Sequence, residues 1–412
     1  MSYFERIICS SSTLVDNAHC NPYRYLILPM ALASDGLYHA TLAIAANTLR
    51  LSNPLYRLPA LEHHHHALAY LRGLLDQDQW TDRELDEMTG LVLMLCWFEI
   101  SDNSCSSWVT HLNGYQDLLR ARQHRQAMTS QCRSPHSEQL SSFFNRYFAF
   151  HLVLARTAFR LDDSVFALQP MLGLMHESDA NKLEENEADI IDPYMGLSHS
   201  LLLLINQVAQ IAWEDRDGGS VGDDSNNVLQ LKERLENLQQ IPPPLGNDAE
   251  AETECVAIAE ANRLGALLLL HEVCSRKDTK NERGARHLPR HLQMLDSGEK
   301  DHGVKSILSL ILEKKASMMR TAVLPLWPLF LAGCCAPTDA ERVIVMQLFE
   351  ELEGIRRFGN IAPAMEVVQM VWRQRDLAAQ DGRKKRSDRG GQARFEWERA
   401  MAMLGGWKLS LT

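Results

Sequence analysis

The sequence of 412 residues contains no pair of cysteines at the Cys-x-x-Cys spacing. A zinc finger or zinc cluster needs paired or closely spaced thiolates to enclose its metal, so we expect no such module and no metal site in this chain. The nine cysteines are odd in number and widely scattered, which argues against a disulfide framework and favours a reducing compartment. Several of them, such as Cys96 and Cys334, lie in apolar helical runs, where a free cysteine packs as a small hydrophobic residue.

An excess of positive charge is also missing. The chain has 42 Lys and Arg residues against 53 Asp and Glu residues, which gives a net charge of −11. Because DNA binding needs a concentrated basic face, we expect no autonomous DNA binding. The most basic run, Arg383 to Arg386, has two interpretations that stay open here: a nuclear import signal or a solvated loop.

Long apolar runs and a signal peptide are absent too. No stretch reaches the roughly 18 uninterrupted apolar residues that a membrane-spanning helix needs. The first residues lack the basic-then-apolar order of a secretory signal. Since hydrophobic residues make up 45% and charged residues 23% of the chain, the composition is that of an ordinary globular protein, and we expect no membrane association.

What the sequence does contain is helical periodicity. Apolar residues recur at spacings of three and four along most of the chain, and the alternating runs typical of strands are scarce. We therefore predict an all-α fold, built as a large irregular helical domain with polar loop insertions. Helices are expected within residues 21–50, 59–75, 85–98 and 108–121.

Local signals refine these predicted helices. Pro29 and Gly36 should divide the first segment into two short helices. Thr81 and Glu84 have the spacing of a capping box ahead of the third helix. The second helix is predicted to present an apolar face made of Leu61, His64, Leu68, Leu71 and Leu75.

Polar stretches interrupt the helical pattern, and we predict that each is a loop or an insertion: residues 122–138, 177–192, 213–227 and 276–303. The helical domain is expected to cover residues 1–375. Residues 376–412 should form a charged flexible segment and a short C-terminal helix, with mobility over 374–391. That helix is expected to dock through Phe395, Trp397, Met401 and Leu404.

The sequence carries no strong catalytic or metal-binding motif. His63 and His66 are one helical turn apart and could share a metal, but a solvent-facing helix segment is the more ordinary interpretation. Residues 271–272 begin like a zinc protease motif, yet Ser275 stands where the second histidine is needed. Residues 162–163 lack the third carboxylate of a diphosphate-binding cyclase. We expect neither a metal nor a cofactor.

Four segments have the residues and the order of a known helical family: 21–46, 67–72, 94–119 and 324–372. The last is the most specific. It contains the run Leu324-Pro325-Leu326-Trp327-Pro328-Leu329-Phe330-Leu331-Ala332-Gly333, followed by Glu341-Arg342, Phe358-Gly359-Asn360 and Val371-Trp372. This pattern resembles the fungal-specific transcription factor domain, the helical regulatory region found behind zinc-cluster DNA-binding domains.

The resemblance implies a transcriptional regulator, here one without its own zinc cluster. We expect it to be nuclear and to act on a secondary-metabolite pathway, through other transcription proteins or a hydrophobic small molecule. The alternative is a cytosolic, cofactor-free cyclase, isomerase or pericyclase acting on a hydrophobic natural product, because a shaped apolar pocket with few hydrogen-bond donors suffices for such a reaction. The ionisable candidates for that chemistry are His39, Glu99 and His111.

Both hypotheses lead to the same expected site. The third and fourth segments are the most apolar parts of the chain, and a helical domain of this size must bury both. Bulky Trp residues that pack imperfectly between helices can leave a cavity. We therefore predict a mainly apolar pocket touched by at least one residue from each segment, with these candidates: Trp97, Glu99, Trp108 and His111 from the third, and Trp327 and Cys334 from the fourth.

Overall fold

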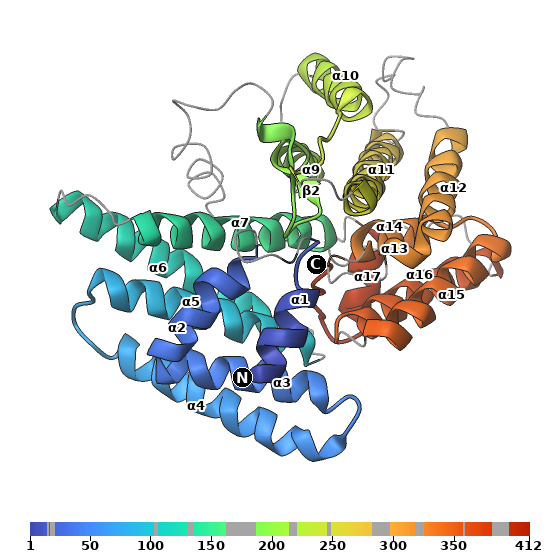
Figure 1. Cartoon of the computed structure of the whole chain (residues 1–412). Coiled ribbons are helices and arrows are strands. Elements are labelled where there is room, and N and C mark those ends of the chain that lie inside the picture. The colour runs from blue at the N-terminus through green and yellow to red at the C-terminus, as the bar shows by residue number, and fades with distance from the viewer. Residues whose placement is uncertain are drawn as a thin grey trace.

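The computed structural model describes residues 1–14, 16, 21–102, 106–129, 135–161, 187–213, 221–244, 249–281, 297–318, 323, 325–356, 359–380 and 395–412. Helices dominate it (Figure 1), which confirms the all-α prediction. In this described part, the strands are β1 (Ile191–Asp192) and β2 (Leu197–Ser198), which pair antiparallel. None of the described helices is long and apolar enough to cross a membrane.

The N-terminal half of the chain forms one group of packed helices. Helix α3 packs against α4 and α5, and α5 packs against α6 and α7. The elements of this group are η1 (Phe4–Ile8), α1 (Cys9–Ser11), η2 (Tyr23–Ile27), α2 (Leu28–Ala33), α3 (Asp35–Leu49), η3 (Pro54–Tyr56), α4 (Arg57–Leu75), α5 (Asp82–Ser101), α6 (Trp108–Thr129) and α7 (Pro135–Ala158).

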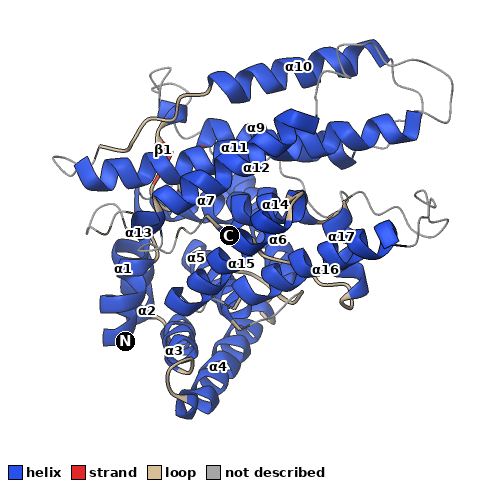
Figure 2. Ribbon diagram, turned by 90° about the vertical axis from the view of Figure 1, so that its right-hand side faces the viewer, coloured by secondary structure: helices blue, strands red, loops and turns tan. Residues whose placement is uncertain are grey.

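The C-terminal half forms a second group, and α7 lies between the two (Figures 1 and 2). Helix α7 contacts α5 on one side and α9 on the other, while α14 packs against α11, α12 and α16. The elements of this group are η4 (Glu187–Asp189), α9 (His199–Trp213), α10 (Val221–Asn237), α11 (Ala249–Asn281), α12 (Ser297–Glu313), α13 (Lys315–Met318), α14 (Leu326–Cys335), α15 (Asp339–Arg356), α16 (Ile361–Gln380) and α17 (Glu396–Met403).

Capping boxes fix where two of these helices begin. At the start of α5, the Thr81 side chain accepts from the backbone N–H of Glu84, and the Glu84 carboxylate accepts from the N–H of Thr81 at 2.7 Å. This confirms the predicted box. A second box, which the sequence analysis did not identify, joins Thr338 and Glu341 ahead of α15. Each box satisfies backbone donors that have no partner within the helix.

The predicted apolar face of α4 is wrong in part. Leu61 and Leu75 are 45% and 47% exposed. The residues of α4 that are buried are Ala60, Ala67, Leu71 and Leu74. Small alanines face α3 here because the two helices pack closely, and this displaces the buried stripe by about one position from the leucine spacing.

Three of the predicted loops are shorter than expected. Helix α6 continues to Thr129, and α7 begins at Pro135, so most of residues 122–138 is helical. The charged half of α6 is held because Arg122 pairs with Asp86 and Arg125 with Asp82, both at 2.7 Å, on α5. Polar residues were therefore a poor sign of a loop.

The same correction applies further along the chain. Residues 221–227 belong to α10, the end of α11 reaches Asn281, and α12 begins at Ser297. In the remaining predicted loop, residues 187–192 form η4 and β1. The expected Gln374 start of a mobile stretch belongs to α16, which ends at Gln380. The other parts of these predictions, and Arg383 to Arg386, lie outside the described residues.

A glycine turn directs the last described segment toward the centre of the molecule. Gly405 and Gly406 have φ angles of 93° and 77°, a left-handed conformation that favours glycine. Beyond the turn, the Lys408 carbonyl accepts a hydrogen bond from Trp108, and the Asn360 amide donates to the carbonyl of Ser410. The segment therefore touches both helical groups.

Candidate functional site

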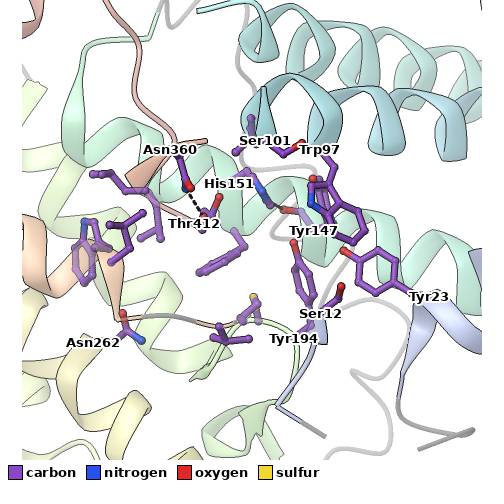
Figure 3. A pocket seen from close by; sticks show the side chains of 18 residues that line it. Ser12, Tyr23, Trp97, Ser101, Tyr147, His151, Tyr194, Asn262, Asn360 and Thr412 are labelled. Atoms are coloured by element: carbon purple, nitrogen blue, oxygen red, sulfur yellow. Dashed lines mark hydrogen bonds between the residues drawn. The ribbon is translucent and has the colours of Figure 1, made fainter. Parts of the chain in front are cut away.

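A cavity of about 100 Å³ lies where the two helical groups meet (Figure 3). Its walls come from segments far apart in the sequence. The residues that line it are Ser12, Tyr23, Trp97, Ile100, Ser101, Tyr147, Phe150, His151, Leu154, Tyr194, Met195, Asn262, Val323, Leu326, Trp327, Asn360, Leu411 and Thr412.

Three helices supply most of the wall. Trp97 comes from α5, Tyr147 and His151 are one turn apart on α7, and Trp327 comes from the first turn of α14. Residues four apart share a face of a helix, so α7 presents one aromatic stripe to the cavity. The turn between β1 and β2 adds Tyr194.

The aromatic side chains support one another. The rings of Tyr23 and Trp97 lie 4.9 Å apart, and those of Tyr147 and Tyr194 are stacked at 5.5 Å. The His151 ring stacks on Tyr147 at 4.1 Å. Burial raises the pKa of all three tyrosines, so each is a neutral phenol at physiological pH.

His151 is neutral in a defined tautomer. Its Nδ1 lies 2.8 Å from the carbonyl oxygen of Tyr147, and because a carbonyl can only accept, Nδ1 carries the proton. Burial lowers the pKa of His151 to about 4, against the smaller opposing effect of this hydrogen bond. The second nitrogen, Nε2, is therefore an unprotonated acceptor in a residue that lines the cavity.

Trp327 is fixed from both sides. Its indole N–H donates to the Thr157 side-chain oxygen at 2.8 Å. On the other side, a Cβ added at Gly265 would lie 3.0 Å from the Trp327 ring, so α11 approaches the indole closely only because it has a glycine there. Asn262, one turn earlier on α11, lines the cavity and donates to the carbonyl of Ile258.

Of the residues predicted from the sequence, Trp97 and Trp327 line the cavity, one from each predicted segment. Trp108 does not. Its buried indole donates to the Lys408 carbonyl at 2.7 Å, so it fastens the glycine-turn segment to α6. Cys334 is buried within α14 but is not part of the wall, and burial raises the pKa of its thiol.

Glu99 and His111 belong to a separate polar cluster between α4, α5 and α6. The Glu99 carboxylate lies 3.4 Å from Nε2 of His64 and accepts a hydrogen bond from the Ser107 hydroxyl. Burial acts to raise the pKa of Glu99, but these two partners lower it to about 2. Burial lowers the pKa of His111 to about 4. The cluster braces three helices and does not line the cavity.

His39 lies with the α4 histidines. Its Nδ1 is 2.9 Å from Nδ1 of His63, and its ring stacks on His66 at 4.8 Å. Within the part of the chain that the structure describes, no group of three or more His, Cys, Asp or Glu side chains is placed to hold a metal ion. Asp162-Asp163 lies outside the described residues.

The sequence analysis missed most of the wall. The α7 residues were detectable in principle, because six aromatic or imidazole side chains fall within 143–151: Phe143, Phe144, Tyr147, Phe148, Phe150 and His151. Tyr194, Asn262 and Asn360 have no such signal, since each reaches the cavity through a turn or the side of a distant helix.

Comparison with known proteins agrees with the sequence pattern. The family model of the fungal specific transcription factor domain matches residues 1–412. The chain belongs to this family. It is therefore a regulatory domain of the kind found in fungal transcription factors.

The chain is also similar to the acriflavine sensitivity control protein acr-2 of Neurospora crassa. The two are 22% identical over 407 residues, which is 93% of this chain and 63% of that protein. The chain thus spans less than two thirds of its relative's length. No solved structure matches the chain.

Proposed function

We propose that this domain regulates transcription in response to a small molecule that binds in the cavity between the two helical groups. The observation that carries the proposal is the origin of the cavity wall. Ser12 and Trp97 come from the N-terminal half, and Trp327 and Asn360 from the C-terminal half. A ligand there would contact both groups at once.

Such a ligand would act by stabilising one arrangement of the two groups over another. A ligand shifts a conformational equilibrium only by its difference in affinity for the two states. Because the wall is built from both groups, any relative movement changes the contacts of a bound molecule. The changed arrangement would then be recognised by other transcription proteins.

The wider setting is part of the same proposal. The domain works in the nucleus, on genes of a secondary-metabolite pathway, and reaches DNA through partners. Family membership and the acidic net charge of −11 support this setting. The name of the Neurospora relative connects that protein with sensitivity to acriflavine, which supports a response to small molecules in this chain as well.

The test is to fill the cavity in the cell. Leu154→Phe adds bulk to the α7 wall, and Leu312→Phe adds the same bulk at a position that is 43% exposed on α12. We expect a deletion strain that carries Leu154→Phe to lose the regulated change in transcripts of the neighbouring genes. The strain with Leu312→Phe should respond as wild type. A Leu154→Phe protein that stays folded and supports the full response would contradict the proposal.

A further inference from the structure

We infer that the ligand of this cavity is an uncharged aromatic molecule of one or two rings that carries a hydrogen-bond donor, such as a hydroxyl or ring N–H. This inference rests on the proposed function and specifies the ligand class. It follows from four properties of the wall: its charge, its rings, its size and its free polar atoms.

The wall offers no charge to pair with an ion. Its 18 residues include no Asp, Glu, Lys or Arg. His151 and the three tyrosines are neutral at physiological pH, because burial lowers the pKa of the imidazole and raises those of the phenols. An ion that leaves water for such a site loses its hydration without gaining a counter-charge, so neutral ligands are strongly favoured.

The rings and the size of the cavity favour a small aromatic ligand. Tyr23, Trp97, Tyr147, Phe150 and Trp327 all line it. Aromatic pairs contribute about 0.5–1.5 kcal/mol beyond the area they bury. A cavity near 150 Å³ is known to accommodate benzene, so a volume of about 100 Å³ suits a single ring or a small fused pair.

The free polar atoms of the wall are mainly acceptors. The hydroxyls of Ser12 and Ser101 already donate to the carbonyls of Ile8 and Phe98. The Asn360 amide donates to the Thr412 carbonyl at 2.8 Å, as the dashed line in Figure 3 shows.

Acceptor atoms remain beside these occupied donors. Nε2 of His151 is an unprotonated acceptor, and Asn262 uses its amide N–H on the Ile258 carbonyl, which leaves its Oδ1. A buried acceptor gains most from a ligand that donates a hydrogen bond to it.

A cation is the main competing ligand, because aromatic faces also attract positive charge. Two observations weigh against it here. Tyr147 is stacked between His151 and Tyr194, at 4.1 Å and 5.5 Å, so these neighbouring rings cover its faces. No carboxylate in the wall would assist a bound cation. The experiment therefore includes a cationic probe.

Binding of five small probes to the purified full chain tests each property separately. The probes are benzyl alcohol, benzylammonium, benzoate, ethylbenzene and cyclohexylmethanol, and ligand-observed NMR titration measures their affinities. We expect benzyl alcohol to bind best and the two ions at least about tenfold more weakly, a difference of about 1.4 kcal/mol. Ethylbenzene lacks the donor and cyclohexylmethanol lacks the ring, so both should bind several-fold more weakly than benzyl alcohol.

Two variants locate the binding. Leu154→Phe should weaken every probe at least tenfold, while Leu312→Phe should weaken none. His151→Phe keeps an aromatic ring but removes the Nε2 acceptor, so the preference for benzyl alcohol over ethylbenzene should disappear. Thermal melting of each variant confirms that it is folded.

The outcomes separate this inference from the proposed function. An ion that binds as well as benzyl alcohol, equal affinities for the alcohol and cyclohexylmethanol, or no binding of any probe at millimolar concentration would overturn the ligand class. The transcript response of the Leu154→Phe strain decides the proposed function independently. A lost transcript response together with tight benzoate or benzylammonium binding would refute only the inference made here.

Discussion

The indole N–H of Trp327 donates a hydrogen bond of 2.8 Å to the side-chain oxygen of Thr157, 170 residues earlier in the chain. Both residues are buried. The backbone carbonyl of Thr157 also accepts a hydrogen bond from the indole of Trp397 at 3.3 Å. One residue near the end of α7 therefore holds two tryptophans from the C-terminal part of the chain, one of them in the cavity wall.

Removing the Thr157 hydroxyl should destabilise the fold. Thr157→Val keeps the shape of the side chain but leaves the Trp327 donor buried without its acceptor, which costs about 1–3 kcal/mol. Thr157→Ser keeps the oxygen and should cost less. Denaturant unfolding of the two variants measures the difference, and equal stabilities would show that this hydrogen bond contributes nothing.

The helical class and several local features were predictable from the sequence, because they depend on neighbouring residues. The box of Thr81 and Glu84 needs only residues three apart. The buried Trp327 could be expected because α14 is apolar on every side. What stayed out of reach depends on pairing between helices: Arg122 looked like part of a loop because its partner, Asp86, lies on another helix.

The candidate site divides in the same way. Trp97 and Trp327 were found because each stands in a long apolar run. His151 and Asn262 were not, since nothing in the sequence places α7 beside α11 and the turn before β2. Conversely, Glu99 and His111 attracted attention as ionisable residues in apolar helices, and the structure explains them as partners of a separate cluster with His64.

Gly333 should tolerate no side chain. A Cβ there would lie 3.0 Å from Val345 and 3.1 Å from Val368, on α15 and α16. β-Branched residues have little rotamer freedom with which to move away. We expect Gly333→Ala to lose about 1 kcal/mol or more, despite the better helix propensity of alanine.

Gly354 is the matched control for this substitution. It also lies in a helix, and an added Cβ would meet nothing within 4 Å. Gly354→Ala should therefore raise the stability by about 0.5–1 kcal/mol. Thermal melting of both variants checks the pair; a Gly333→Ala protein as stable as Gly354→Ala would mean that the valines can move aside.

The pair of Arg122 and Asp86 should matter more than a surface ion pair on the same helix. Both side chains are largely buried, at 9% and 14% exposure, whereas Arg120 and Asp117 are solvent-exposed. Arg122→Ala leaves the Asp86 carboxylate without its partner, so we expect a loss of about 3 kcal/mol or more. Arg120→Ala should cost less than about 0.5 kcal/mol. Similar unfolding midpoints for the two variants would contradict this assignment.

Stability should fall in mild acid because of buried neutral histidines. The pKa of His151 is about 4 in the folded protein, below its ordinary value of 6.5, and that of His111 is also about 4. Above pH 6.5 both imidazoles are neutral in either state, so their contribution is complete. Between pH 6.5 and 4 the unfolded chain binds protons that the folded chain does not, and stability decreases as the pH falls.

His151→Phe tests this origin of the acid sensitivity. Each pKa unit corresponds to about 1.4 kcal/mol, so removing one of the two groups should make the loss of stability between pH 6.5 and 4 clearly smaller. Glu99 adds a separate loss at lower pH, from 4.5 down to its folded pKa of about 2, and the variant should keep it. Melting temperatures measured from pH 7 to pH 3 distinguish the two regions. An unchanged slope between pH 6.5 and 4 in His151→Phe would show that His151 is protonated in the folded protein, which would also remove its Nε2 as an acceptor in the cavity.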